Sequence, residues 1–301
     1  MRPEIRRLAA GLPSAPGVYR FRDARGRVLY VGRATELRAR VGSYGGDLRD
    51  RRHLRRMIPQ VTRIEAVACD SVHEAAWLER NLLEESLPRW NRTAGGEEVP
   101  AYLRLDARPA TAGLRLTHEA GQPVAGVRVF GPYLGGTRAR LAVSALHRVH
   151  PLSATGSGLS GAERELAARR GVGDREELAE AVAAVLRRDP VAVATARQEL
   201  ERVRDRAAAA LAFELAGRVQ EELRALGWVT AAQQVTTLEP VDLLVRGWAD
   251  GWQVSFAVRA GRVRSWSQRR CARPPQEPPA AWAGFARRNA ELAATLARLA
   301  Q

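Results

Sequence analysis

Apolar and polar residues near the start of the chain alternate with the two-residue period of strands. Residues 17–22, Gly-Val-Tyr-Arg-Phe-Arg, and residues 28–32, Val-Leu-Tyr-Val-Gly, both show this pattern, and Asp23-Ala-Arg-Gly26 between them has turn chemistry. We therefore expect a β-hairpin in this region. Residues 61–69 alternate well enough to predict a third strand.

Helices are predicted around these strands. Thr35 can cap a helix that reaches about Ser43, and a second helix is expected over residues 48–58. Ser71-Val-His-Glu74 has the form of a capping box, which predicts a helix that runs to about Leu87. Together these elements predict an α/β (α+β) domain with a small antiparallel sheet flanked by helices.

The rest of the chain is predicted to be a mixed β and helical region. Residues 100–133 have the pattern of short strands with Gly and Pro turns, and residues 241–269 that of three further strands. Helical patterns cover residues 137–148, 162–170, 174–188, 190–226 and 280–300. We accordingly expect four consecutive domains, over residues 1–93, 94–152, 153–237 and 238–301.

The net charge of the chain predicts a class of binding partner. All 48 basic residues are arginine, against 33 acids, which gives a net charge of +15 over 301 residues. A GC-rich genome would explain arginine in place of lysine, but not the excess over acids. Residues 1–93 alone hold 19 arginines and 11 acids. This balance predicts a polyanionic partner, with nucleic acid ahead of an anionic membrane.

Two further features narrow the compartment and the chemistry. No run approaches the ~18 apolar residues of a membrane span, and the N-terminus shows no signal-peptide core. The two cysteines, Cys69 and Cys271, are too few for a disulfide framework, a four-cysteine zinc site or an iron–sulfur cluster with four thiolates from one chain. A cytoplasmic protein is expected.

One acidic residue stands out in the helix that follows Ser71. Val72, Ala75 and Leu82 mark its apolar face, and Glu79 falls on that same face. A carboxylate there must be paired, hydrogen-bonded or bound to a metal, because an unpaired buried charge is costly. A structural ion pair with an arginine and a metal site are both open at this point.

The hairpin and the helix after it contribute more candidates. Tyr19 and Tyr30 lie on strand faces where tyrosines are most often core aromatics with a hydroxyl at the rim. Arg40 and Tyr44 are spaced i and i+4 on one side of a helix, which also fits a solvated arginine and a packing tyrosine. Taken singly, none of these residues indicates a chemistry.

In combination the residues resemble the GIY-YIG nuclease family. Gly17-Val-Tyr19, Tyr30-Val-Gly32, Arg40, Glu79 and Asn91 occur in the order and spacing of that family. The stretch from about residue 12 to residue 93 is most similar to the N-terminal domain of the UvrC excinucleases and of their shorter homologue Cho. The resemblance implies an endonuclease that hydrolyses one phosphodiester bond with one divalent metal.

The resemblance also implies the roles of the metal ligand and the general base. Glu79 would be the protein ligand of Mg²⁺, for which Mn²⁺ can substitute, and the ion would take the rest of its shell from water and phosphate. Tyr30, held by Tyr19, would activate the attacking water. A phenol has a pKa of about 10, so this role needs nearby positive charge.

Other residues would handle the phosphate. Arg33 and Arg40 would clamp the scissile phosphate, Tyr44 would hydrogen-bond the phosphate region, and Asn91 would orient groups near the metal. Where this chain has Arg33, UvrC proteins usually have lysine. Arginine keeps the charge but does not lose its proton, so only an electrostatic role is expected for Arg33.

Weaker similarity continues beyond residue 100. Phe130-Gly-Pro-Tyr133 resembles a UvrC motif that commonly precedes a cysteine cluster, but residues 150–175 contain no cysteine, so no iron–sulfur cluster is expected. His147-x-x-His150 could be a metal pair, although lone pairs at this spacing usually are not. Residues 198–235 resemble the UVR hairpin through which UvrC meets UvrB, or else form an amphipathic pair that packs on its own domain.

The favoured hypothesis is a Mg²⁺-dependent endonuclease that makes a single incision, 3′ to a lesion in duplex DNA, in nucleotide excision repair and the SOS response. Residues 241–269 resemble no more than the start of the second UvrC nuclease domain. The alternative is a non-catalytic DNA-binding or adaptor protein on the same scaffold; a mobile-element or restriction nuclease is less favoured. Metal binding at Glu79 would support the enzyme, and pairing of Glu79 with arginine alone would support the adaptor.

Overall fold

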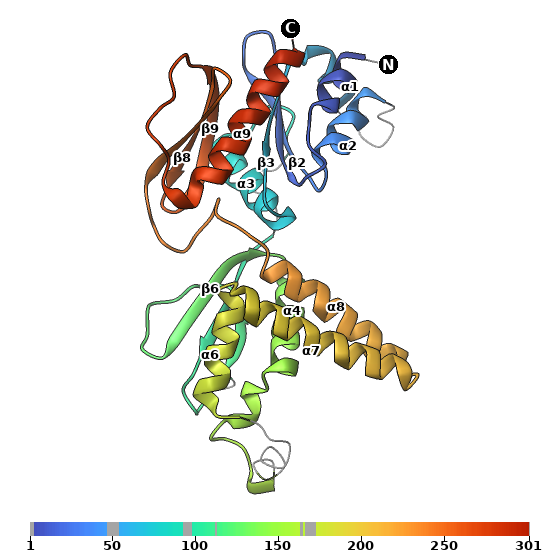
Figure 1. The fold of residues 1–301 in the computed structure, drawn as a ribbon, viewed down its shortest axis with the longest axis vertical. Helices are drawn as coiled ribbons and strands as arrows, with labels where there is room; N and C mark the ends of the chain where they lie inside the picture. The colour runs from blue at the N-terminus through green and yellow to red at the C-terminus, as the bar shows by residue number, and fades with distance from the viewer. Residues whose placement is uncertain are drawn as a thin grey trace. The chain divides into compact units, whose positions relative to one another are not determined.

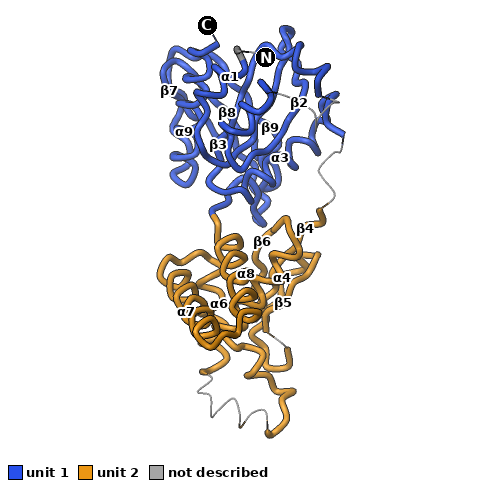
Figure 2. The backbone as a smooth tube through the Cα atoms, turned by 90° about the vertical axis from the view of Figure 1, so that its right-hand side faces the viewer, with its two compact units in different colours: residues 1–97, 232–301 blue, residues 98–231 orange. Residues whose placement is uncertain are grey.

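The computed structural model describes residues 3–46, 54–92, 98–111, 113–162, 165 and 173–300. The chain forms two compact units: residues 1–97 together with 232–301 make unit 1, and residues 98–231 make unit 2 (Figure 2). This grouping differs from the four consecutive domains expected from the pattern, because the first and last segments share one unit and the middle segments share the other.

The N-terminal half of unit 1 is built on a three-stranded antiparallel sheet of order β2-β1-β3. The predicted hairpin and third strand are confirmed, and Tyr19 pairs with Gly32 across the hairpin. Tyr19 and Phe21 on the central strand are fully buried. The elements are α1 (Pro3–Ala10), β1 (Gly17–Arg22), β2 (Val28–Ala34), α2 (Leu37–Gly42), η1 (Ser43–Gly45), η3 (Ile58–Gln60), β3 (Arg63–Ala68) and α3 (Val72–Glu85).

Some helix boundaries differ from the expectation. The cap predicted at Thr35 is wrong: α2 has Glu36 as its N-cap, with no side-chain cap hydrogen bond. Instead the amide of Leu37 donates to the carbonyl of Ala15 (2.9 Å), so the preceding loop satisfies the start of the helix. The helix predicted over residues 48–58 lies largely outside the described residues, and its end falls in 3₁₀ turns.

The Ser71 cap of α3 is confirmed, but the carboxylate of Glu74, the other half of the predicted capping box, bonds elsewhere. The Ser71 side chain accepts a hydrogen bond from the amide of Glu74 (2.9 Å). The buried Glu74 carboxylate does not close the box; it accepts from the amides of Asp70 (2.7 Å) and Gln234 (2.8 Å). Burial raises the pKa of Glu74 despite these bonds. The start of α3 is thereby tied to the chain that returns from unit 2.

The C-terminal half of unit 1 is a second antiparallel sheet and a long helix. The sheet contains β7 (Leu243–Ala249), β8 (Trp252–Arg259) and β9 (Arg262–Arg270), and the helix is α9 (Ala280–Leu299). The predicted turns are confirmed, since Asp250, Gly251, Ala260 and Gly261 all have positive φ. In Figure 1, α9 lies between the two sheets of unit 1, and it contacts β3 as well as β7 and β8.

Two sets of buried side chains show why the ends of the chain fold together. Leu292 and Leu296 of α9 belong to the same apolar core as Tyr19 and Phe21. Asn289 accepts a hydrogen bond from the amide of Ala68 (2.7 Å) and donates to its carbonyl (3.2 Å), which satisfies the backbone at the end of β3. The N-terminal sheet therefore depends on a helix more than two hundred residues away in the sequence.

Unit 2 combines a third antiparallel sheet with a helical layer. Its sheet has the order β5-β4-β6, and α4, α7 and α8 pack together beside it. Apolar residues of the strands and helices share one buried core. The elements are β4 (Pro100–Asp106), β5 (Leu114–Thr117), β6 (Val127–Leu134), α4 (Gly136–Val149), η4 (Leu152–Thr155), α6 (Arg175–Leu186), α7 (Pro190–Ala209) and α8 (Phe213–Val229).

The helix predicted over residues 190–226 is divided into α7 and α8. The chain reverses at residues 210–212, where Leu211 adopts a positive φ of 58°. No glycine or proline marks this turn in the sequence, so the pattern alone could not locate it. The reversal lets α8 bury Val219 and Leu226 in the core of unit 2.

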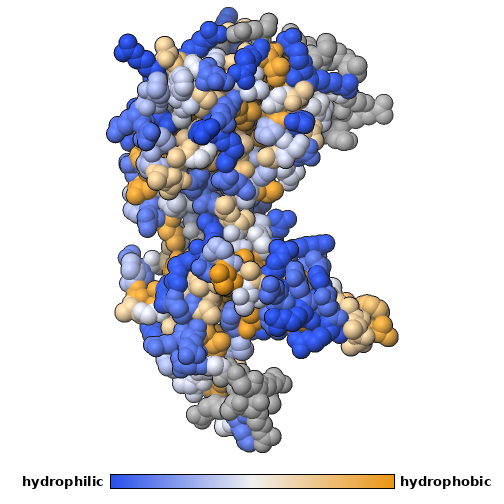
Figure 3. Space-filling view, viewed as in Figure 1, coloured by the Kyte–Doolittle hydropathy of each residue, from blue (hydrophilic) through white to orange (hydrophobic). Residues whose placement is uncertain are grey.

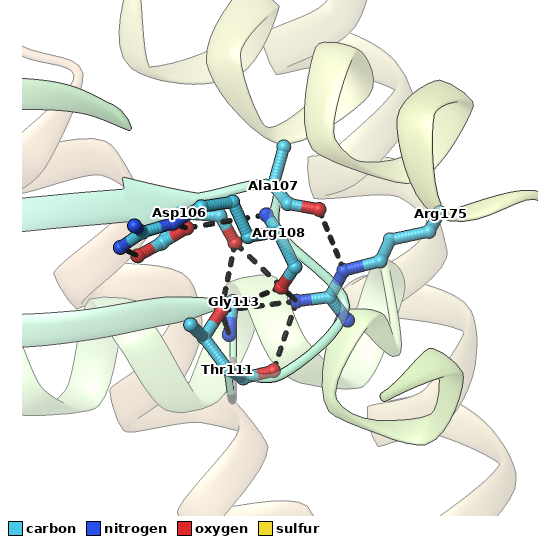
Figure 4. Close-up of polar contacts among 6 residues, drawn as sticks. All are labelled: Asp106, Ala107, Arg108, Thr111, Gly113 and Arg175. Carbon is cyan, nitrogen blue, oxygen red and sulfur yellow. Dashed lines mark hydrogen bonds and ion pairs between the residues drawn. The ribbon is translucent and has the colours of Figure 1, made fainter. Parts of the chain in front are cut away.

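A buried arginine organises the loops of unit 2. Arg175, at the start of α6, donates hydrogen bonds to the carbonyl oxygens of Ala107 (2.8 Å), Arg108 (2.9 Å), Thr111 (2.9 Å) and Leu152 (3.0 Å), and Figure 4 shows its guanidinium reaching the loop after β4. A planar guanidinium with five N–H donors suits this task. None of the helices in the described ranges is long and apolar enough to cross a membrane.

Candidate active site

Three tyrosines from three elements meet on one face of the N-terminal sheet. Tyr19 comes from β1, Tyr30 from β2 and Tyr44 from η1, and their ring centroids lie 5.9 to 6.5 Å apart. The hydroxyls of Tyr19 and Tyr44 are hydrogen-bonded at 2.6 Å. Phe21 packs edge-on against Tyr44, with centroids 5.1 Å apart. The tyrosines were expected from the sequence to act together, and the structure brings them together.

Burial makes Tyr19 and Tyr30 weaker acids than an ordinary phenol, because it raises the pKa of both. Burial raises the pKa of Tyr30, and Tyr44 raises it further through charge and a hydrogen bond, while Arg40 lowers it less. Burial also raises the pKa of Tyr19 well above the ordinary value. The balance of these effects leaves the hydroxyl of Tyr30 protonated at neutral pH.

Arg40 places a cation beside the tyrosines. Burial lowers its pKa, but the hydroxyls of Tyr19, Tyr44 and Tyr30 outweigh burial, and the pKa of Arg40 is raised overall. Its Nε is buried and has no hydrogen-bond partner among the described residues. Arg40 is thus a half-buried cation beside the tyrosines, and its charge suits it to bind an anionic ligand.

Glu79 faces this cluster from α3, at the edge of the buried face. Its side chain is 22% exposed, and its Oε1 accepts a hydrogen bond from the amide of Arg33 (3.0 Å). Its Oε2 lies 3.3 Å from Nε of Arg33. Burial raises the pKa of Glu79, although Arg33 and Arg40 lower it. The helical phase was predicted from Val72, yet Val72 is 40% exposed, so Glu79 lies nearer the rim than expected.

Asn91 supports the site from behind. Its side-chain Oδ1 accepts from the amide of Val31 (2.9 Å), and its Nδ2 donates to the carbonyl of Val31 (2.8 Å). Both polar groups of the side chain are therefore used on the outer edge of β2, between Tyr30 and Gly32. This arrangement positions the strand that carries Tyr30 and Arg33.

Gly32 is a site residue that side-chain chemistry alone does not single out. A Cβ at this position would lie 2.6 Å from the hydroxyl oxygen of Tyr19 and 2.7 Å from Cε1 of Tyr30. Only glycine lets the two phenol rings approach over the hairpin. The signal was available in the sequence, because a glycine inside a strand often marks the close approach of another group.

The donor set at this site fits a hard divalent cation. Glu79 offers one partly exposed carboxylate, which suits an ion that keeps most of its waters. Across the residues that the structure describes, no three acidic, histidine or cysteine side chains gather to hold a metal. The His147–His150 pair therefore gains no further ligand there, and Nε2 of His147 lies 2.9 Å from the carbonyl oxygen of Leu114 instead.

Comparison with known proteins identifies the N-terminal region and its relatives. Residues 15–92 match the model of the UvrC-like GIY-YIG domain. UvrABC system protein C of Thermobifida fusca is 31% identical over 288 residues, which cover 88% of this chain and 43% of that protein. The homologue from Trichlorobacter lovleyi is 36% identical over 149 residues, 50% of this chain and 24% of that protein. The chain thus spans less than half the length of these relatives.

A solved structure is similar over a shorter range. It is the GIY-YIG N-terminal endonuclease domain of UvrC from Thermotoga maritima, bound to magnesium. The match is 29% identical, covers 31% of this chain and 100% of that domain, and has a TM-score of 0.28.

Proposed function

Because residues 15–92 are a UvrC-like GIY-YIG domain, we propose that this chain is a DNA endonuclease of nucleotide excision repair. The proposed reaction is hydrolysis of one phosphodiester bond, on the 3′ side of a lesion in duplex DNA. It requires a divalent cation, Mg²⁺ or Mn²⁺. The observation that supports it most is the convergence of Tyr19, Tyr30, Arg40 and Glu79 on one face of the small sheet.

Each residue has a role that its surroundings support. Arg40, a half-buried cation beside the tyrosines, binds the scissile phosphate. Tyr30 hydrogen-bonds the attacking water and, in its phenolate form, takes the proton of that water as general base, while Tyr19 and Tyr44 pack against the Tyr30 ring. Glu79 holds the cation, which when bound supplies positive charge to the developing oxyanion. Asn91 positions β2.

Arg33 gives the alternative function its support. Its guanidinium lies against the carboxylate oxygen that a cation would use, so Glu79 is paired with arginine. If that ion pair persisted in the presence of a cation, the scaffold would serve as a non-catalytic DNA-binding or adaptor protein. Arg33 is 46% exposed, which leaves its side chain room to turn toward a phosphate when a cation takes the carboxylate.

Incision of a duplex that carries one bulky adduct tests the proposal. With Mg²⁺, and with UvrA and UvrB present or absent, we expect one nick 3′ to the adduct. Glu79→Gln should lose more than about 100-fold in rate, on the order of the effect of one essential catalytic group, and retain DNA binding. Glu85→Gln, on the same helix but exposed, is the control. Binding without incision by the unmodified protein would support the adaptor.

We further propose that the α7–α8 hairpin binds UvrB. Leu211, Phe213 and Leu215, at its free end, are 72%, 67% and 41% exposed. Figure 3 shows hydrophobic surface at this end of the hairpin, beyond a strongly hydrophilic stretch. Exposed apolar residues that gather in one place are typical of a protein interface.

Two aspartate substitutions test whether UvrB binds this end of the hairpin or any exposed apolar residue. Phe213→Asp should reduce UvrB binding at least about tenfold, because it places a charge in the apolar contact. Val191→Asp is the matched control, since Val191 is 74% exposed but lies at the other end of α7, about 30 Å away at about 1.5 Å per residue. Equal binding by both variants in a titration with labelled UvrB would contradict the assignment.

A further inference from the structure

The C-terminal sheet of unit 1 has one covered face and one open face. On the covered face, Val245, Val254 and Phe256 are buried, and α9 packs on β7 and β8. Gly247 lies so close to α9 that a Cβ there would be 2.0 Å from the carbonyl oxygen of Ala286. Alternate residues point the opposite way. They form the open face, defined here by Arg246, Trp248, Gln253, Ser255, Ser267 and Arg269.

Strand register arranges the open face in two rows. Arg246, Ser255 and Ser267 pair across β7, β8 and β9, and Trp248, Gln253 and Arg269 form the next row. Arg246 is on one edge strand and Arg269 on the other, one row apart, so two strand spacings and two residues along the strands separate their backbones, about 12 Å. Two arginines thus flank a floor of serines.

The charge on this sheet is strongly one-sided. Residues 243–270 contain six arginines and one acid, Asp250. Arg262 and Arg264 pair with Glu84 of α3. Arg246 and Arg269, in contrast, have no acidic partner within the described ranges. Their charge is therefore available to an anion from outside the chain.

Hydrogen bonds within the open face leave mainly donor groups for a ligand from outside the chain. Gln253 is buried; its Oε1 accepts from Arg269 (3.3 Å) and its Nε2 donates to the hydroxyl of Ser255 (2.8 Å). Since Ser255 is an acceptor in that bond, its own O–H can donate outward. Trp248 has its indole N–H on the carbonyl of Cys271 (2.7 Å), which fixes the ring. The donors that remain for a ligand are guanidinium and hydroxyl groups.

We propose that the open face binds the sugar–phosphate backbone of duplex DNA, as a contact separate from the active site. Arginine and serine side chains are the usual partners of DNA phosphates, and such contacts position the protein without reading sequence. A membrane would call for apolar groups between the cations. Here Ser255, Ser267 and Gln253 lie between the two arginines. The large apolar side chains of this face, Trp248 and Leu244, lie on the edge strand β7. The choice of DNA as ligand rests on the proposed function; the presence of an anion site rests on the sheet alone.

Binding to an undamaged, labelled duplex at several salt concentrations tests the inference. Fluorescence anisotropy measures the binding, and EDTA prevents cleavage. For Arg246→Ala/Arg269→Ala, the log–log salt slope should fall by about 1.8, at about 0.9 per phosphate contact, and affinity should drop roughly tenfold. The matched control, Arg197→Ala/Arg287→Ala, removes two arginines that pair with Glu201 and Glu291. Its slope should stay unchanged. Unaltered melting temperatures establish that both variants fold.

Equal slopes for the two variants would overturn the inference. So would a loss in the first variant that affects single-stranded DNA or phosphatidylserine vesicles but not duplex. Incision assays report separately on the active site: a chain that binds duplex through the open face but never nicks DNA would contradict the proposed function and leave this contact standing.

Discussion

At the scale of single residues, the site is a set of groups whose ordinary properties are changed by their neighbours. Tyr30 is a weaker acid than a free phenol, chiefly because it is buried and hydrogen-bonded to Tyr44. Glu79 is also a weaker acid than usual, chiefly through burial. Both effects arise from residues that are far apart in the sequence. The residue types could be read from the chain, but not their altered acidity.

The raised pKa of Tyr30 predicts a dependence of incision on pH. The phenol is protonated at neutral pH, so the fraction able to accept a proton grows as pH rises toward its pKa. We expect the incision rate under single-turnover conditions to increase with pH from about 7 to about 9, with a slope near one decade per pH unit. Tyr30→Phe should remove activity throughout. A rate that is flat over this range, with Mg²⁺ saturating, would argue against Tyr30 as the base.

At the scale of elements, buried ion pairs link β1 to β3, and one arginine of this network also contacts the second sheet of unit 1. Glu65 on β3 is 2% exposed and pairs with Arg20 on β1, and also with Arg22 (2.9 Å) and Arg63 (3.1 Å). The Arg20 guanidinium stacks on Trp266 of β9, with Cζ 3.9 Å from the ring centroid. The charged network of the first sheet thus reaches the second sheet through the Arg20 guanidinium, which also donates to the carbonyl of Trp266 (3.0 Å).

This network predicts how stability changes with acid. Burial raises the pKa of Glu65, but Arg20, Arg22 and Arg63 outweigh it and hold that pKa below its usual value. Because the folded state favours the carboxylate, its contribution is complete above the unfolded pKa of about 4.3 and is lost as pH falls through the folded pKa. Glu65→Gln should cost about 3–5 kcal/mol at pH 7, because it leaves buried Arg20 unpaired.

Urea unfolding at several pH values measures this effect. The difference in free energy of unfolding between the unmodified protein and Glu65→Gln should shrink as pH drops below about 4.3. Glu291→Gln is the control, since Glu291 pairs with Arg287 at an exposed position and should change the free energy of unfolding by less than about 1 kcal/mol. A constant difference from pH 7 to acid would show that the Glu65 charge is not what stabilises the fold.

At the scale of the whole molecule, the N-terminal domain is completed by the last helix of the chain. Removal of residues 232–301 would expose the core around Leu292 and Leu296 and leave the backbone of Ala68 without Asn289. We therefore expect residues 1–97 alone to unfold at lower urea than unit 1 does in the intact chain. Within the intact chain, Asn289→Ala should cost about 1–3 kcal/mol, the penalty for buried backbone groups left unpaired.

Hydrogen exchange at Ala68 and urea unfolding report on this dependence. Thr295→Ala removes an exposed side-chain hydrogen bond to the carbonyl of Glu291 on the same helix. This control should change the free energy of unfolding little. If residues 1–97 were as stable alone as in the intact chain, the α9 contact would be incidental to the nuclease fold.

The sequence determined the parts of this protein that depend on local chemistry. The hairpin, the Ser71 cap, the two C-terminal turns and the identity of the tyrosine, arginine and glutamate candidates follow from short-range pattern and from resemblance. Periodicity is a property of a few neighbouring residues, so these elements are visible without the fold. The resemblance over residues 198–235 indicated a helical hairpin, but no short-range pattern placed its reversal at Leu211.

The tertiary structure alone decided how these parts combine. It joined the two ends of the chain in one unit, placed Arg33 on Glu79, and assigned Asn91 to the edge of β2. It also left the open face of the C-terminal sheet with arginines that have no acidic partner among the described residues. The physical reason is that burial, pKa and pairing depend on which groups approach in space. A linear pattern gives the groups that are present, and only folding fixes their neighbours.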